Sequence, residues 1–279
     1  MHSLSRRIST LAVCGILVLV LTLIVQGIWT GLLIANLRTS PGLPWAIMAM
    51  ALLLWLIWQY LHGKWWPRST SEARRRNLRA NRLPPRVFGW AVLAGLLSIV
   101  ALTGFWIVLF QLAKVPGNAL PDFSKYPSLP VALMLVMASL VGGVIEEAGF
   151  RGYFQGMLER NVGGPTAILI TCLVIAPGHA LTQGLVWPTL LFYLLVDAML
   201  GVTAYLTNSI LPGIVIHATG LMTFFTLVWP YDATRRLLGT VSGDTWLWIH
   251  GAQTLIFTAF AIIVFIHLAR VTERRYQLG

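Results

Sequence analysis

The sequence is divided into a series of apolar runs, each close to the length that crosses a lipid bilayer. A transmembrane helix needs about 20 predominantly apolar residues. Because backbone polar groups in lipid must be satisfied within the protein, such runs are expected to be helices. We therefore expect an all-α, polytopic integral membrane protein that forms one transmembrane domain over residues 1–279. It would have about eight spans, at 8–36, 43–61, 87–113, 130–157, 165–180, 187–206, 210–229 and 246–268.

The composition agrees with this class. Of 279 residues, 57% are hydrophobic and only 10% are charged, which is unlike a soluble globular domain. The net charge of +11 would suggest a nucleic-acid partner if the chain were soluble. Here the basic residues gather in loops between spans, so we expect the lipid bilayer as partner and no nucleic acid.

The distribution of basic residues predicts the orientation. Loops on the cytoplasmic side of a membrane protein carry an excess of Lys and Arg. The segment between the second and third spans is rich in them, as are both termini, whereas the opposite loops hold few, among them Lys114, Arg235 and Arg236. We expect both termini on the cytoplasmic side, in the cytoplasmic membrane of a bacterium. The basic segment is interpreted as a solvated topology signal, with contact to anionic lipid heads as the alternative.

Charged residues inside a predicted span need an explanation. Glu146, Glu147 and Arg151 lie within the fourth span, and each charge at the bilayer centre costs about 2.5–3.5 kcal/mol on insertion scales. On a helix, Glu147 and Arg151 are i,i+4 neighbours that can pair. Glu146 points about 100° around the helix from Glu147, so the same Arg cannot pair with it as well. Glu146 is therefore the carboxylate that is left free for chemistry. Asp197 in the sixth span can pair with Arg151 or hold its helix against another polar neighbour, and we favour the second role.

Two histidines also lie deep in predicted spans, His179 in the fifth and His217 in the seventh. A carboxylate beside a histidine can take a proton from water, and a second histidine can stabilise an oxyanion. Glu146 and the two histidines could instead gather Zn²⁺ from separate helices, although no His-Glu-x-x-His run is present. They could also be no more than hydrogen-bonded polar groups of the core.

Three motifs in this part of the chain resemble those of the CPBP family, which comprises the CAAX prenyl proteases and bacteriocin-processing enzymes, also called Abi proteins. Glu146-Glu147-x-x-x-Arg151-Gly152-Tyr153 is similar to the first motif. Ile175-x-x-x-His179 is similar to the second, with Ile in place of Phe. The approach from Gly201 to Pro212 into His217 is similar to the third, but Leu221 stands where the family has Asn. The resemblance covers about residues 129–225, which would form the catalytic core.

The resemblance implies a glutamate-type intramembrane endopeptidase. Glu146 and His179 would activate a water, and His217, alone or with Thr219, would stabilise the oxyanion. Glu147 and Arg151 would orient the site. The resemblance favours catalysis without a cofactor, with Zn²⁺ as the alternative. Replacing the family Asn by Leu221 removes a hydrogen-bond donor, and loss of one oxyanion donor typically lowers turnover by about 100- to 1000-fold.

We therefore predict an intramembrane endopeptidase that acts on a peptide or protein substrate. The alternative is a non-catalytic CPBP-like scaffold or bacteriocin-immunity protein that keeps the polar cluster for folding and partner binding. A transporter that uses the acids as a proton site is disfavoured because no inverted repeat is detectable. The sequence assigns neither an oligomeric state nor a substrate, prenylated or not.

Overall fold

The computed structural model describes residues 2–113, 123–228 and 245–278, and this part of the chain is helical without a β-strand. The expected loop residues Lys114, Arg235 and Arg236 lie outside it. In chain order the elements are α1 (His2–Thr39), α2 (Trp45–Leu61), η1 (Arg68–Thr70), α3 (Ser71–Leu78), α4 (Pro85–Leu112), η2 (Phe123–Lys125), α5 (Ser128–Glu146), η3 (Glu147–Gln155), α6 (Gly156–Val162), α7 (Gly164–Gln183), α8 (Trp187–Thr207), α9 (Leu211–Thr223), η4 (Phe224–Val228) and α11 (Thr245–Leu278).

Six stretches of helix in the described residues are long and apolar enough to cross a membrane. They are Val18–Thr39, Pro85–Leu112, Ser128–Val162, Trp187–Thr207, Leu211–Val228 and Thr245–Glu273. The expected spans at 43–61 and 165–180 correspond to the shorter apolar helices Trp45–Leu61 and Gly164–His179. The protein is therefore an integral membrane protein whose described residues are helical, without strands, and include six candidate spans. The count of eight stays a prediction.

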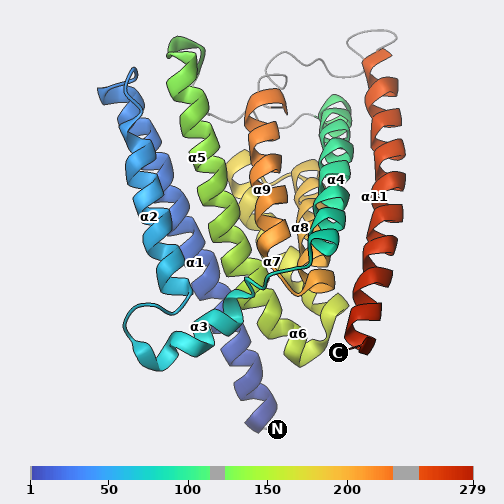
Figure 1. The fold of residues 1–279 in the computed structure, drawn as a ribbon. Coiled ribbons are helices and arrows are strands. Elements are labelled where there is room, and N and C mark those ends of the chain that lie inside the picture. Colours follow the sequence, from blue (N-terminus) through green and yellow to red (C-terminus); the bar gives the residue numbers. More distant parts are fainter. Residues whose placement is uncertain (1, 114–122, 229–244, 279) are drawn as a thin grey trace.

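The spans stand roughly side by side, and α3 crosses one end of the bundle (Figure 1). The start of α1 and the end of α11 lie at this same end (Figure 1). The assignment of this end to the cytoplasm stays a prediction. Large apolar side chains on the outer faces are exposed, among them Leu52, Leu169, Leu255 and Ile263, as expected for helices that contact lipid.

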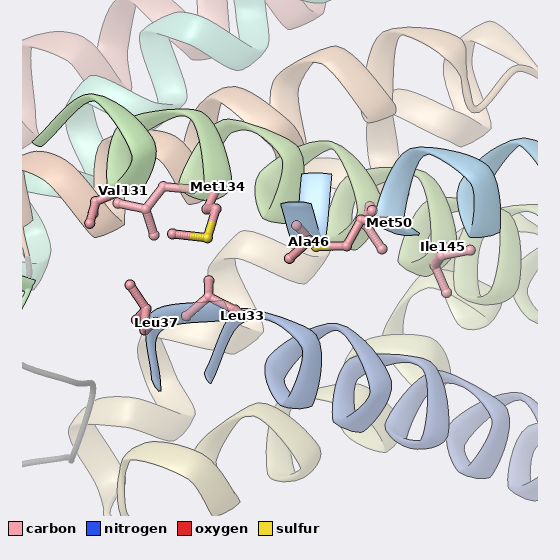
Figure 2. Packing of buried hydrophobic residues seen from close by; sticks show 9 residues of the cluster. Leu33, Leu37, Ala46, Met50, Val131, Met134 and Ile145 are labelled. Carbon is pink, nitrogen blue, oxygen red and sulfur yellow. The ribbon is translucent and has the colours of Figure 1, made fainter. Parts of the chain in front are cut away.

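One hydrophobic cluster joins α1, α2 and α5. Leu33 and Leu37 of α1 lie near Val131 and Met134 of α5, and Ala46 and Met50 add the side chains of α2 (Figure 2). This packing fixes the position of α1 against α5, the helix that ends in Glu146.

A second hydrophobic cluster, made largely of aromatic rings, lies between α4, α8 and η4. Trp106 of α4 is 1% exposed, and its ring packs against Phe110, Phe192, Tyr193 and Phe224. Rings of this size bury a large apolar area in edge-to-face contacts. This cluster therefore places α8 and the end of α9 around the same interior space that α1 and α5 approach from the other side.

The basic segment between α2 and α4 corrects one expectation. Most of its Lys and Arg side chains are exposed, but Arg74 and Arg79 are both only 5% exposed. Arg79 follows α3 in a left-handed conformation, with φ of 54°, and its carbonyl accepts a hydrogen bond from the Ile210 amide. The interpretation of the whole segment as a solvated signal is therefore wrong, because these two guanidinium groups find hydrogen-bond acceptors within the protein.

Candidate active site

The charged group of the fourth predicted span occupies an irregular part of the helix. Glu146 ends α5 and Glu147 begins η3, a π-helix of nine residues that also carries Arg151. The sequence predicted regular α-helix here. π-Helical turns are rare and often occur at functional sites. All three charged side chains are at least 96% buried.

Both glutamates reach His217 of α9. Glu147 Oε1 lies 3.0 Å from His217 Nδ1 in a hydrogen bond, and Glu146 Oε2 lies 3.5 Å from Nε2 of the same ring. The imidazole therefore lies between the two carboxylates. When Nδ1 donates its hydrogen to Glu147, Nε2 is the ring atom that faces Glu146.

A glycine allows this close approach of α9. Gly213 lies one helical turn before His217, and a Cβ at this position would lie only 2.5 Å from Glu147 Oε2. Gly143 of α5 similarly faces α9, where a Cβ would lie 3.0 Å from the backbone nitrogen of Ala218. Small residues let membrane helices pack at short distance, and here they bring the His217 ring within reach of both glutamates.

His179 of α7 approaches the same carboxylate oxygen. Its Nε2 lies 3.4 Å from Glu146 Oε2, and its ring stacks on Tyr193 of α8 at 4.8 Å between centroids. Glu146 Oε2 is buried and forms no hydrogen bond within the described residues. The structure thus brings together three of the side chains that the sequence singled out, and it leaves one carboxylate oxygen able to accept a proton.

Arg151 connects this group to α8. Its Nη2 lies 2.6 Å from Asp197 Oδ1, and its Nη1 lies 3.6 Å from Glu147 Oε1. The expected pair of Glu147 and Arg151 is therefore present. For Asp197 the sequence favoured another polar neighbour, and the structure shows the pairing with Arg151 instead. A continuous chain of contacts runs from Asp197 through Arg151 and Glu147 to His217.

Part of this cluster of charged and histidine side chains faces a cavity of about 540 Å³, a volume in the range of small-molecule sites. Glu146, His179 and His217 line it, and the rest of its lining is mostly apolar and aromatic, including Trp29, Phe150, Trp106, Phe192, Tyr193 and Phe224. Low polarity around a few charged groups strengthens their electrostatic interactions. The cavity can therefore hold an apolar segment of another molecule against the carboxylate.

The two departures from the family motifs also lie at this cavity. Ile175 is buried and lines it, as does Leu221, one helical turn after His217. Thr219 was one of two alternatives for the oxyanion, in which His217 acts alone or with Thr219. Its hydroxyl donates to the Val215 carbonyl at 2.8 Å, and it is not part of the lining. Thr219 follows His217 by two residues, which places it on another face of α9 and favours the alternative in which His217 acts alone.

One site residue was missed by the sequence analysis. Gln26 of α1 lines the cavity and donates a hydrogen bond from Nε2 to Glu146 Oε1. A signal was present, because Thr22, Gln26 and Thr30 recur every four residues in an apolar run and all three line the cavity. Such spacing puts polar residues on one face of a helix.

The alternative ligands for Zn²⁺ were Glu146, His179 and His217. Within the described ranges, no group of three or more His, Cys, Asp or Glu side chains is arranged to hold a metal ion. The described residues therefore show no preformed zinc centre, and no step proposed below uses one. Catalysis without a cofactor stays a prediction.

Residues 128–223 match the family described as type II CAAX prenyl endopeptidase Rce1-like. The matched range contains Glu146, Glu147, Arg151, His179 and His217, and it excludes Gln26. No curated protein and no solved structure matches the chain. The family resemblance that the motifs indicated is confirmed, and it supports peptidase activity in a membrane protein.

Proposed function

From the match of residues 128–223 to the type II CAAX prenyl endopeptidase Rce1-like family, we propose that this protein is an intramembrane endopeptidase of the glutamate type. The observation that carries the proposal is the position of Glu146 Oε2. It lies 3.4 Å from His179 Nε2 and 3.5 Å from His217 Nε2 at the wall of a cavity. Two imidazoles aimed at one buried carboxylate oxygen are suited to proton transfer.

In the proposed reaction, Glu146 is the general base. It takes a proton from a water, whose oxygen attacks the carbonyl carbon of the scissile peptide bond, and His179 orients that water. The carbonyl oxygen becomes an oxyanion in the tetrahedral intermediate. The carbon–nitrogen bond then breaks, and the proton held by Glu146 passes to the departing amine. The products are a new carboxylic acid, which gives up its proton to solvent, and a new amine.

His217 is proposed to stabilise the oxyanion. Its Nδ1 is fixed by Glu147, so Nε2 is held towards the cavity, where a protonated ring presents a hydrogen-bond donor. Preorganised donors of this kind contribute most in a site that excludes water. Arg151 is a positioning residue because it contacts Glu147, and Asp197 is one because it contacts Arg151; neither side chain lines the cavity.

The cavity favours an apolar substrate segment. Its lining combines several aromatic rings with few polar side chains, and most of its lining residues lie on candidate spans. A peptide whose scissile bond lies next to apolar residues or a lipid group fits such a space. A fluorescent peptide with a farnesylated CAAX end is therefore the first probe, chosen from the description of the matched family.

The test compares wild-type protein with Glu146→Gln in lipid nanodiscs. Gln keeps the size of the side chain and removes the base, so we expect cleavage of the farnesylated peptide to fall by at least about 100-fold. Mass spectrometry of peptides released from membranes with each variant measures the same loss on natural substrates.

The matched control is Glu72→Gln, because Glu72 is exposed on α3 away from the cavity. It should cleave as the wild type does. If Glu146→Gln releases the same peptides at the same rate as the wild type, the endopeptidase proposal is wrong. The alternative of a non-catalytic scaffold would then account for the polar cluster.

A further inference from the structure

The contact between Gln26 and Glu146 joins the part of the chain outside the matched family range to the proposed general base. Gln26 lies on α1, 120 residues before Glu146, and its amide nitrogen donates to Oε1. Gln26 is partly buried and lines the cavity beside Glu146. The same face of α1 brings Thr22 and Thr30 to the cavity.

The hydrogen bond distinguishes the two oxygens of the carboxylate. Oε1 accepts from Gln26, whereas Oε2 accepts no hydrogen bond within the described residues and faces both imidazoles. A carboxylate free to rotate would exchange these oxygens. With Oε1 held by α1, Oε2 is the atom kept available to take a proton.

On the α9 side of the cavity, Leu221 lies beside α5: a Cβ on Gly142, one helical turn before Glu146, would lie 2.9 Å from Leu221 Cδ1. The side chain that faces α5 beside the carboxylate is therefore apolar. The hydrogen bond to Glu146 Oε1 comes instead from Gln26 of α1.

We propose that Gln26 is a positioning residue for Glu146, supplied by α1, and that it sets which carboxylate oxygen acts as the base. This inference rests on the proposed endopeptidase function. It also assigns α1 a part in the active site, in addition to its packing against α2 and α5.

The test measures kcat, KM and the thermal unfolding midpoint with the farnesylated CAAX peptide. Gln26→Met keeps the length of the side chain and removes the donor, so we expect kcat to fall by about 10- to 100-fold with KM and the midpoint unchanged. Gln26→His retains a ring N–H at a similar reach, and its kcat should stay within about tenfold of the wild type. The matched control is Gln59→Met, on α2 outside the cavity lining, which should change nothing.

Three results would overturn the inference: an unchanged kcat for Gln26→Met, equal losses for Met and His, or a fall in kcat that accompanies a fall in the unfolding midpoint. The last would assign the contact a packing role. Glu146→Gln, measured in parallel, separates this question from the proposed function. If Glu146→Gln is inactive while Gln26→Met is fully active, the endopeptidase proposal stands and the role of Gln26 does not.

Discussion

Two buried arginines, Arg79 and Arg151, lie close together in this bundle and differ in how well they are hydrogen-bonded. All three guanidinium nitrogens of Arg79 donate, to Asn208 Oδ1, to Glu159 and to the carbonyl oxygens of Ala204 and Arg151. Its ion pair with Glu159 has a distance of 3.0 Å. Arg79 thus joins α3, α6 and the end of α8 at one end of the bundle.

Arg151 is less completely satisfied. Its Nη2 donates to Asp197, but its Nε and Nη1 form no hydrogen bond with any described residue. Among its acidic neighbours, Glu146 Oε2, Glu147 Oε2 and Asp197 Oδ2 are also without a donor in the described part of the chain. A buried polar group left unsatisfied costs about 1–3 kcal/mol, and each such group needs an explanation.

The comparison teaches that the two buried clusters have different roles. The Arg79 guanidinium has an acceptor for each of its nitrogens, as expected of a group that stabilises the fold. The Arg151 cluster is incomplete and adjoins the cavity, as expected of a site whose partners include water or substrate. The predictions below are ways to break or sharpen this distinction.

The largest expected effect is on stability, from Arg79→Met. The change leaves Glu159 without its cation and three acceptors without their donor, and breaking a buried ion pair costs about 3–5 kcal/mol. We expect a clear fall in the thermal unfolding midpoint, measured in detergent micelles. The control is Arg75→Met, since Arg75 is exposed on α3, four residues before Arg79. An Arg79→Met protein as stable as this control would break the comparison.

Next, Asp197→Asn should lower activity more than stability. Asn keeps an oxygen for Arg151 but removes the charge, so Arg151 is drawn towards Glu147 and the His217 ring loses its fixed position. We expect kcat for the farnesylated peptide to fall by about 100-fold, since small misplacements near the reacting atoms can cost this much. A fall in the unfolding midpoint as large as that of Arg79→Met, with activity lost only in proportion, would contradict the prediction.

Two glycines allow a matched pair of smaller changes. A Cβ at Gly213 would lie 2.5 Å from Glu147 Oε2, and a Cβ at Gly156 would lie 2.9 Å from Arg79 Cδ. Overpacking typically costs about 1–3 kcal/mol. Gly213→Ala should chiefly lower kcat, and Gly156→Ala should chiefly lower the unfolding midpoint. Gly27→Ala meets nothing within 4 Å and should be neutral. The distinction fails if both variants show the same balance of effects.

The smallest expected effect is that of a metal chelator. If Glu146 acts with the two histidines and no metal, prolonged treatment with a chelator should leave cleavage of the farnesylated peptide unchanged. Cleavage rates before and after dialysis against the chelator measure this. Loss of activity that returns on addition of Zn²⁺ would show that the three side chains bind a metal after all.

Much of the fold was readable from the sequence because hydrophobic length is a local property. Each candidate span corresponds to an apolar run, and charges inside such a run stand out without any knowledge of packing. This is why Glu146, Glu147, Arg151, His179 and His217 could all be selected in advance. The pair of Glu147 and Arg151 was also predictable, because it depends on spacing along one helix.

The sequence by itself determined a helical membrane chain and the set of polar side chains that its interior had to accommodate. Only the tertiary structure decided their partners: Asp197 with Arg151, Gln26 with Glu146, and Arg79 with the end of α8. The choice between His217 alone and His217 with Thr219 was left open by the sequence for the same reason. The physical cause is that helix packing sets which helix faces meet. Helix packing depends on many weak contacts and on glycines such as Gly213. The insertion cost of a charge, in contrast, depends mainly on the residue and its depth in the bilayer.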